Sequence, residues 1–183
     1  MTESRPDGAI YAKGTLEFVT VAAEYCAQME QCAGKTRSDF ADTMLKLLPL
    51  LYMKARMLPS MDEDASFLPD GQVSEDDYNY VRMNVYQIFG KDDQYEELTA
   101  NEDMNTEESQ WRSLSEDLAD IYQPLRNFVF VYQQRLETCM PPALYEVEES
   151  FRQYWGTDLL CALKRLHTMD NATQTTDDED DSE

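Results

Sequence analysis

The chain has 183 residues, of which 37 are Asp or Glu and 15 are Lys or Arg, so its formal net charge is −22. Because such a charge repels phosphate backbones and anionic lipid surfaces, we expect no direct binding of nucleic acid or membranes. The charge leaves room for a basic protein partner, but the favoured interpretation is simpler, since many soluble bacterial proteins are acidic. The length and the 42% of hydrophobic residues suit one domain with a core, and the scarcity of alternating polar and apolar runs favours helices over strands.

The first half of the chain predicts two long helices before residue 60. The first spans Ile10 or Leu16 to Ala33. The second begins at Ser38, whose hydroxyl can cap it, and runs to about Leu58. It contains Pro49, which removes a backbone hydrogen bond and predicts a kink. Between Leu45 and Tyr52 the second helix is apolar nearly all round, which is typical of a helix at the centre of a fold.

A polar loop over residues 59–73 separates these helices from a third. Ser74 and Asp77 have the spacing of a capping box, so a helix is predicted to begin there and to stop at Gly90. The next stretch, 91–110, is highly acidic and is predicted to be a solvated loop. Trp111 after it is interpreted as the return of the chain to the core.

The second half predicts another long helix and a final helical run. Ser113 or Ser115 begins a helix that extends to about Thr138 and is kinked at Pro124. The final run, 141–167, has one apolar stripe, and Gly156 within it predicts a bend, with Thr157 capping a further helix, or else a close approach of neighbouring backbone. The fold class is therefore all-α: a single irregular bundle of five to six helices over 1–169, followed by a disordered acidic tail over 170–183.

The four cysteines and the N-terminus point to one compartment. Cys26, Cys32, Cys139 and Cys161 lie in or beside apolar helical stretches without C-x-x-C spacing, so they are interpreted as free thiols in a reducing cytosol and not as zinc ligands. The N-terminus has no positively charged region leading into an apolar run, and no segment approaches 18 consecutive apolar residues. We expect a soluble cytoplasmic protein.

The C-terminal third resembles a bacterial all-helical domain family of unknown function. The resemblance is carried by Trp155-Gly156, Ala162-Leu163 and Leu166-His167, preceded by Phe151 and by 120–122. In that family a Trp-Gly pair is followed by an Ala-Leu-x-x-Leu-His ending. This chain lacks the second histidine expected near Asp158, so a histidine pair does not carry over. The resemblance implies a fold class and no activity.

Three carboxylates carry the alternative enzymatic interpretation. Glu116, Asp117 and Asp120 share one helix, and their oxygens are ligands that Mg²⁺ prefers. The segment resembles the metal-binding helix of all-α nucleoside triphosphate pyrophosphohydrolases, which implies Mg²⁺-dependent nucleotide hydrolysis. The second set of glutamates that this family requires is missing from the sequence. Acidic residues in a first turn also stabilise a helix through its dipole, and this interpretation is favoured.

The function favoured by the sequence is non-catalytic protein interaction or scaffolding, with no cofactor. Aromatic residues are abundant, and packing in the core and at its boundary is the favoured interpretation of them. The next interpretation is a groove for a partner protein, since tyrosine suits half-wet surfaces, with Tyr122, Phe151, Trp155 and His167 as its binding residues. For His167, at a helix end, packing or capping is favoured over general-base catalysis. A third hypothesis is mimicry of a nucleic-acid backbone toward a basic protein. The sequence leaves the oligomeric state open.

Overall fold

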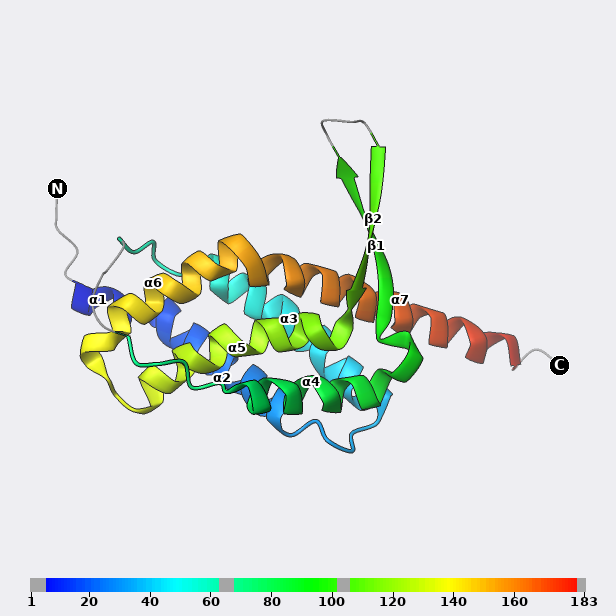
Figure 1. Cartoon of the computed structure of the whole chain (residues 1–183), viewed down its shortest axis with the longest axis horizontal. Coiled ribbons are helices and arrows are strands. Elements are labelled where there is room, and N and C mark those ends of the chain that lie inside the picture. Colours follow the sequence, from blue (N-terminus) through cyan, green and yellow to red (C-terminus); the bar gives the residue numbers. More distant parts are fainter. Residues whose placement is uncertain (1–5, 63–67, 102–105, 181–183) are drawn as a thin grey trace.

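The computed structural model describes residues 6–62, 68–101 and 106–180, which form a helical bundle with one projecting β-hairpin (Figure 1). Six α-helices of eleven residues or more make up the bundle within these residues, which confirms the predicted fold class. In chain order the elements are α1 Pro6–Ile10, α2 Lys13–Glu30, α3 Arg37–Arg56, α4 Glu75–Phe89, β1 Gln94–Asn101, β2 Thr106–Ser113, α5 Leu114–Gln133, α6 Met140–Ser150, a π-helical turn Phe151–Trp155 and α7 Gly156–Asp180.

The helix starts follow from their capping residues. The Ser74 side chain accepts from the backbone N–H of Asp77 while the Asp77 carboxylate accepts from the backbone N–H of Ser74, so the predicted capping box of α4 is confirmed. Ser113 caps α5 by accepting from the backbone N–H of Glu116. The cap of α3 is Thr36 and not the predicted Ser38, because the Thr36 hydroxyl accepts from the backbone N–H of Asp39.

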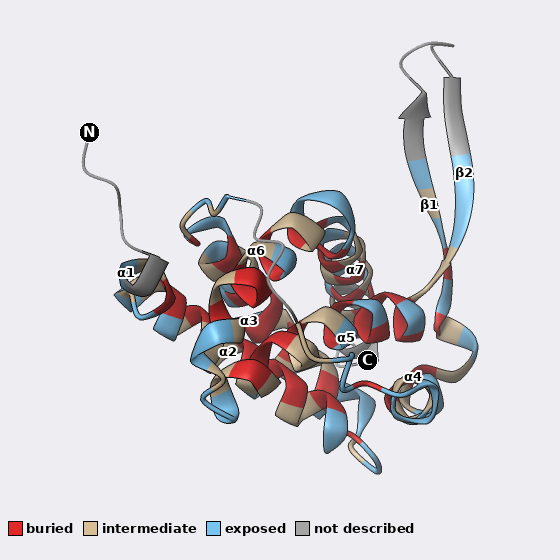
Figure 2. Cartoon of the chain, turned by 60° about the vertical axis from the view of Figure 1, so that its left-hand side comes forward, coloured by how far each residue is buried: buried red, intermediate tan, exposed pale blue. Residues whose placement is uncertain are grey.

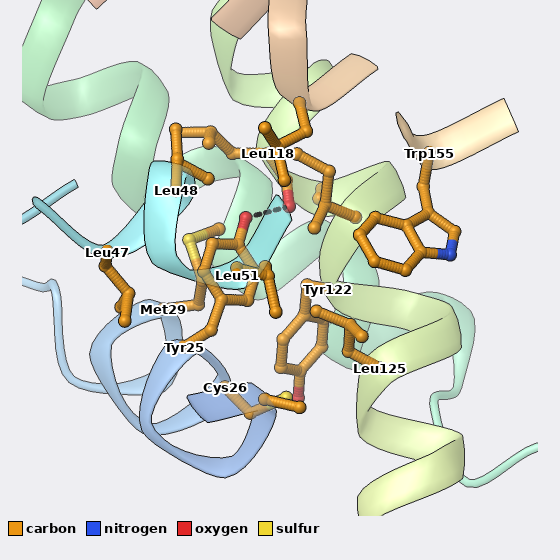
Figure 3. Close-up of a cluster of buried hydrophobic side chains, with 14 of the residues drawn as sticks. Tyr25, Cys26, Met29, Leu47, Leu48, Leu51, Leu118, Tyr122, Leu125 and Trp155 are labelled. Carbon is orange, nitrogen blue, oxygen red and sulfur yellow. Dashed lines mark hydrogen bonds between the residues drawn. The ribbon is translucent and has the colours of Figure 1, made fainter. Parts of the chain in front are cut away.

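The core lies between α2, α3, α5 and α7. Figure 3 shows side chains of α2, α3 and α5 interlocking there, with Tyr25 at the centre of the cluster. Tyr25 is fully buried, and its hydroxyl donates to the carbonyl oxygen of Leu118 at 2.8 Å, so the polar tip of a core residue is satisfied by a neighbouring helix. Pro49 and Pro124 both lie inside their helices, as predicted.

The acidic stretch after α4 is not the predicted loop. β1 and β2 pair antiparallel, from Gln94 opposite Ser113 at the base to Asn101 opposite Thr106 at the far end. Figures 1 and 2 show this hairpin standing away from the helices, with buried Tyr95 near its base. The prediction failed because strand pairing depends on a partner strand, and the many acidic side chains hide a weak period-two pattern.

The final helical run stays helical through Gly156, and Figure 1 shows its direction change between α6 and α7. α6 continues through the π-helical turn into α7, and Thr157 caps no new helix. A Cβ atom added to Gly156 would lie 2.5 Å from the carbonyl oxygen of Phe151 and 3.0 Å from its ring. The backbone therefore comes close to Gly156, as the second interpretation of this residue predicts. The π turn places Phe151 and Trp155 together against the core.

Three further predictions concern the cysteine thiols, the presence of membrane-spanning helices and the C-terminal tail. All four cysteines are free thiols; Cys26 and Cys32 are buried, and Cys139 and Cys161 are partly buried. Within the described ranges, no helix combines the length and the apolar character needed to cross a bilayer. α7 extends to Asp180, into the acidic segment that the sequence predicts to be a disordered tail.

Candidate functional site

The base of the hairpin is fixed to the bundle by Arg112, the residue before the end of β2. Its Nη2 atom donates to Asp117 of α5 at 2.5 Å and to Asp158 of α7 at 2.6 Å. The arginine side chain is 16% exposed and that of Asp117 is 5% exposed. One guanidinium therefore joins strand, α5 and α7 in a nearly dry environment, where charge-assisted hydrogen bonds are strong.

Tyr95 of β1 lies directly opposite Arg112 across the hairpin and reaches the same carboxylate. The Tyr95 hydroxyl donates to the second carboxylate oxygen of Asp117, and the guanidinium of Arg165 lies 5.5 Å from the centre of the Tyr95 ring. Arg165 in turn donates to the backbone oxygen of Asp92 at 2.7 Å. Both strands are thus held, at the second residue pair from the base, by side chains of α5 and α7.

Asp93, in the turn between α4 and β1, closes the N-terminus of α5. It is 2% exposed, and its carboxylate accepts from the Ser113 hydroxyl at 2.6 Å and from the backbone N–H of Ser115 at 2.8 Å. Its backbone oxygen accepts from the N–H of Leu114 at 2.9 Å. These bonds satisfy donors that the first turn of a helix leaves without partners, and they join the turn before the hairpin to the start of α5.

The electrostatics of this cluster depend on burial. Burial raises the pKa of Asp117 to about 6, although its bonds with Arg112 and Tyr95 oppose the shift. Burial and the bond with Asp117 both raise the pKa of Tyr95 well above its usual range. Burial lowers the pKa of Arg112, but its bonds with Asp117 and Asp158 outweigh this effect and raise that pKa overall. At neutral pH the centre of the cluster is therefore a cation held by carboxylates.

The residues of the predicted Mg²⁺ alternative surround this arginine and do not converge on an open site. Asp117 binds Arg112, Asp120 accepts from the Tyr78 hydroxyl at 2.7 Å, and Glu116 lies 3.7 Å from the Arg82 guanidinium. Across the described parts of the chain, no group of three or more His, Cys, Asp or Glu side chains is placed to hold a metal ion.

Three of the four predicted binding residues are buried and present no surface to a partner. Trp155 is 1% exposed and donates from its ring nitrogen to the carbonyl oxygen of Val147 at 3.2 Å, while the Tyr122 hydroxyl donates to Glu30 at 3.0 Å (Figure 3). Phe151 packs against Trp155, with the two ring centres 4.6 Å apart and the ring planes tilted by 58°. His167 lies on the exposed side of α7. The apolar spacing that marked these aromatic residues is the signature of core packing.

The exposed aromatic surface lies beside the hairpin base instead. Trp111, predicted to return to the core, is 71% exposed, and with Tyr86 of α4 it lines a pocket of about 310 Å³ that also includes Arg82 and Glu116. Leu98, 57% exposed, lies on the same face of the hairpin as Trp111, because Glu96 pairs with Trp111 and Leu98 with Ser109. Exposed Met83 and Tyr80 continue from Tyr86 at helical spacing. We call Tyr80, Met83, Tyr86, Leu98 and Trp111 the docking surface.

Sequence reasoning missed this surface because it depends on the hairpin. Trp111 alternates with Arg112, and only the strand period places the first outward and the second inward. The signal available in the sequence was the acidic, polar composition around Trp111, which is untypical of a core segment.

Comparisons with known proteins agree with this architecture. The model of a family described as a domain of unknown function (DUF5063) matches residues 9–171. The crystal structure of protein BF1032 from Bacteroides fragilis, a structural-genomics target, is similar to this chain with a TM-score of 0.77 and 38% sequence identity, over 88% of this chain and 94% of that one. No curated protein matches the sequence significantly.

Proposed function

Since the chain belongs to the DUF5063 family, a domain of unknown function, we propose its role from its own surface: a non-catalytic protein-interaction domain that binds a basic segment of another protein at the docking surface. The observation that carries this proposal is the exposure of Trp111 next to Arg112, which is bonded to Asp117 and Asp158 of the bundle. Tryptophan is the residue most enriched at binding hot spots, and holding its backbone in place reduces the entropy lost on binding.

The charge around Trp111 supports a basic partner. Residues 94–113 contain six acidic residues and one basic residue, Arg112, whose charge is already held by Asp117 and Asp158. Glu96 pairs with Trp111 across the hairpin and accepts from the Ser109 hydroxyl, while Glu116 lines the pocket beside Trp111, 3.7 Å from Arg82. A lysine or arginine of a partner can place its alkyl stem and charge on the Trp111 ring while it meets these carboxylates. Long-range attraction by the net charge of −22 increases the association rate.

The enzymatic alternative has less support. Nucleotide hydrolysis through Mg²⁺ requires carboxylates free to bind the ion, whereas Asp117 and Asp120 are engaged by Arg112 and Tyr78. The pocket beside Trp111 contains two arginines and two acidic residues and lacks histidine and cysteine. Binding of a partner protein can use the side chains that line this pocket and requires no metal ion.

The test is binding of a short oligoarginine peptide to the intact chain, followed by NMR of the two tryptophan indoles and by calorimetry. We expect the indole signal of Trp111 to shift while that of Trp155, bonded to Val147 in the core, stays in place. Trp111→Ala should weaken binding by about tenfold or more, because it removes a hot-spot side chain without changing the charge of the protein.

The matched control is Tyr154→Ala, which truncates another exposed aromatic residue, 65% exposed, in the π turn. It should bind the peptide as the unaltered chain does. Equal affinities of the unaltered chain, Trp111→Ala and Tyr154→Ala would mean that attraction to the peptide is purely electrostatic, and the docking surface would then be discarded.

A further inference from the structure

One edge of α3 is apolar and uncovered. Every residue from Leu45 to Met53 except Lys46 is apolar, a pattern typical of a helix enclosed on all sides. The structure buries one face of this helix and leaves Leu50, Met53 and Met57 at 38%, 49% and 57% exposure. Since these residues are three and four positions apart, they form one stripe.

The neighbouring helix at the end of the stripe is α2. Gly14 of α2 lies next to the backbone of Met57, and the carboxylate of Glu17 accepts from Lys54 at 2.6 Å. We call Leu50, Met53 and Met57 the α3 edge. It lies on a different helix from the docking surface, and no residue is shared between the two.

The charge around the α3 edge differs from that of the rest of the molecule. Residues 13–57 contain six basic and five acidic residues, whereas the remaining chain contains nine basic and 32 acidic residues. The charges that flank the edge are paired with each other: Lys54 with Glu17, and Lys46 with Asp42 at 2.6 Å. A basic partner is therefore drawn to the hairpin and not to this edge.

We propose that the α3 edge is the surface through which two copies of this chain pair about a two-fold axis. Two molecules with a charge of −22 each repel one another, and this segment, close to neutral, is where they approach with the least repulsion. When α3 meets its copy antiparallel with the axis near Met53, Leu50 of one copy lies opposite Met57 of the other, so one apolar stripe covers both. The pairing is independent of the docking surface and leaves it open.

The test is analytical ultracentrifugation of the full chain over a wide range of protein concentration, in low and in high NaCl. We expect dimers whose dissociation constant falls as NaCl rises, because salt screens the repulsion between the two copies. Met53→Glu should raise the dissociation constant by about a hundredfold or more, since it places an unpaired charge at the centre of the contact.

The matched control is Met83→Glu, which makes the same change at an exposed methionine of α4, 41% exposed. It should dimerise as the unaltered chain does, and circular dichroism should show the same helix content in both variants. A chain that is monomeric at every concentration in both salts overturns the proposal, and so does a dimer that Met53→Glu and Met83→Glu affect equally.

Discussion

Asp117 is the residue at which the hairpin, α5 and α7 meet, and its surroundings act on its charge in opposite directions. Burial favours the neutral acid, while Arg112 and Tyr95 stabilise the carboxylate, and the balance raises its pKa to about 6. A carboxyl group whose pKa is higher in the folded than in the unfolded chain binds protons more tightly when folded. Its contribution to stability is therefore full below about pH 4 and is lost as the pH rises toward 6.

This gives a test at a single residue. Between pH 4 and pH 7 the unaltered chain should lose stability relative to Asp117→Asn, by an amount on the order of 2 kcal/mol, because the amide has no proton to release. Urea unfolding at a series of pH values measures the difference. A difference that is flat with pH, or an NMR titration that places the Asp117 carboxyl at its ordinary pKa, would show that Arg112 outweighs burial.

Among the elements of the fold, the π turn connects α6 to α7 in the C-terminal half of the bundle. It lets one continuous helix bring both Phe151 and Trp155 against the core, with Tyr52 packed on Phe151 at 5.3 Å between ring centres. The extra residue of the turn brings the Phe151 carbonyl against Gly156. The family signature Trp155-Gly156 thus has a structural reason: the first residue fills the core and the second leaves room for the backbone.

Gly156→Ala should destabilise the protein by about 1–3 kcal/mol, because the added methyl group overlaps the Phe151 carbonyl and its ring. Gly14→Ala in α2 is the comparison, since its Cβ would make only an ordinary 3.6 Å contact with Met57, and alanine there should be neutral or stabilising. Thermal unfolding of the two variants measures both effects. If the two substitutions shift the midpoint alike, the close approach at Gly156 has no energetic weight.

The elements that the sequence predicted correctly are those with local causes. Ser74 and Asp77 cap α4 through bonds within one turn, and the apolar spacing identified each long helix. The hairpin and the docking surface were missed because they depend on the pairing of β1 with β2, which accompanies the contacts of Arg112 with Asp117 and Asp158. Helical spacing also could not separate an aromatic residue that binds a partner from one, such as Trp155, that packs the core.

The whole molecule carries far more negative than positive charge, and few of its acidic residues have a basic partner nearby. Raising NaCl should therefore stabilise the fold by about 1 kcal/mol, or about 2–4 °C in the unfolding midpoint, because it screens repulsion among the acidic residues. Calorimetry in NaCl and in choline chloride checks this, since screening depends on ionic strength and should be alike in both. A midpoint that falls with salt would mean that attractive ion pairs dominate.

The pairing of Gln94 with Ser113 has a consequence for how such a molecule can vary. The chain leaves the bundle and re-enters it at adjacent points, so strands of any length between them do not change the path from α4 to α5. The outer hairpin can therefore be exchanged as a unit while the residues that fix its base stay unchanged; these are Asp93, Tyr95, Arg112 and Asp117. The partner that the hairpin binds can then change by insertion, deletion or grafting beyond these base residues, while the helices keep the residues that hold them together.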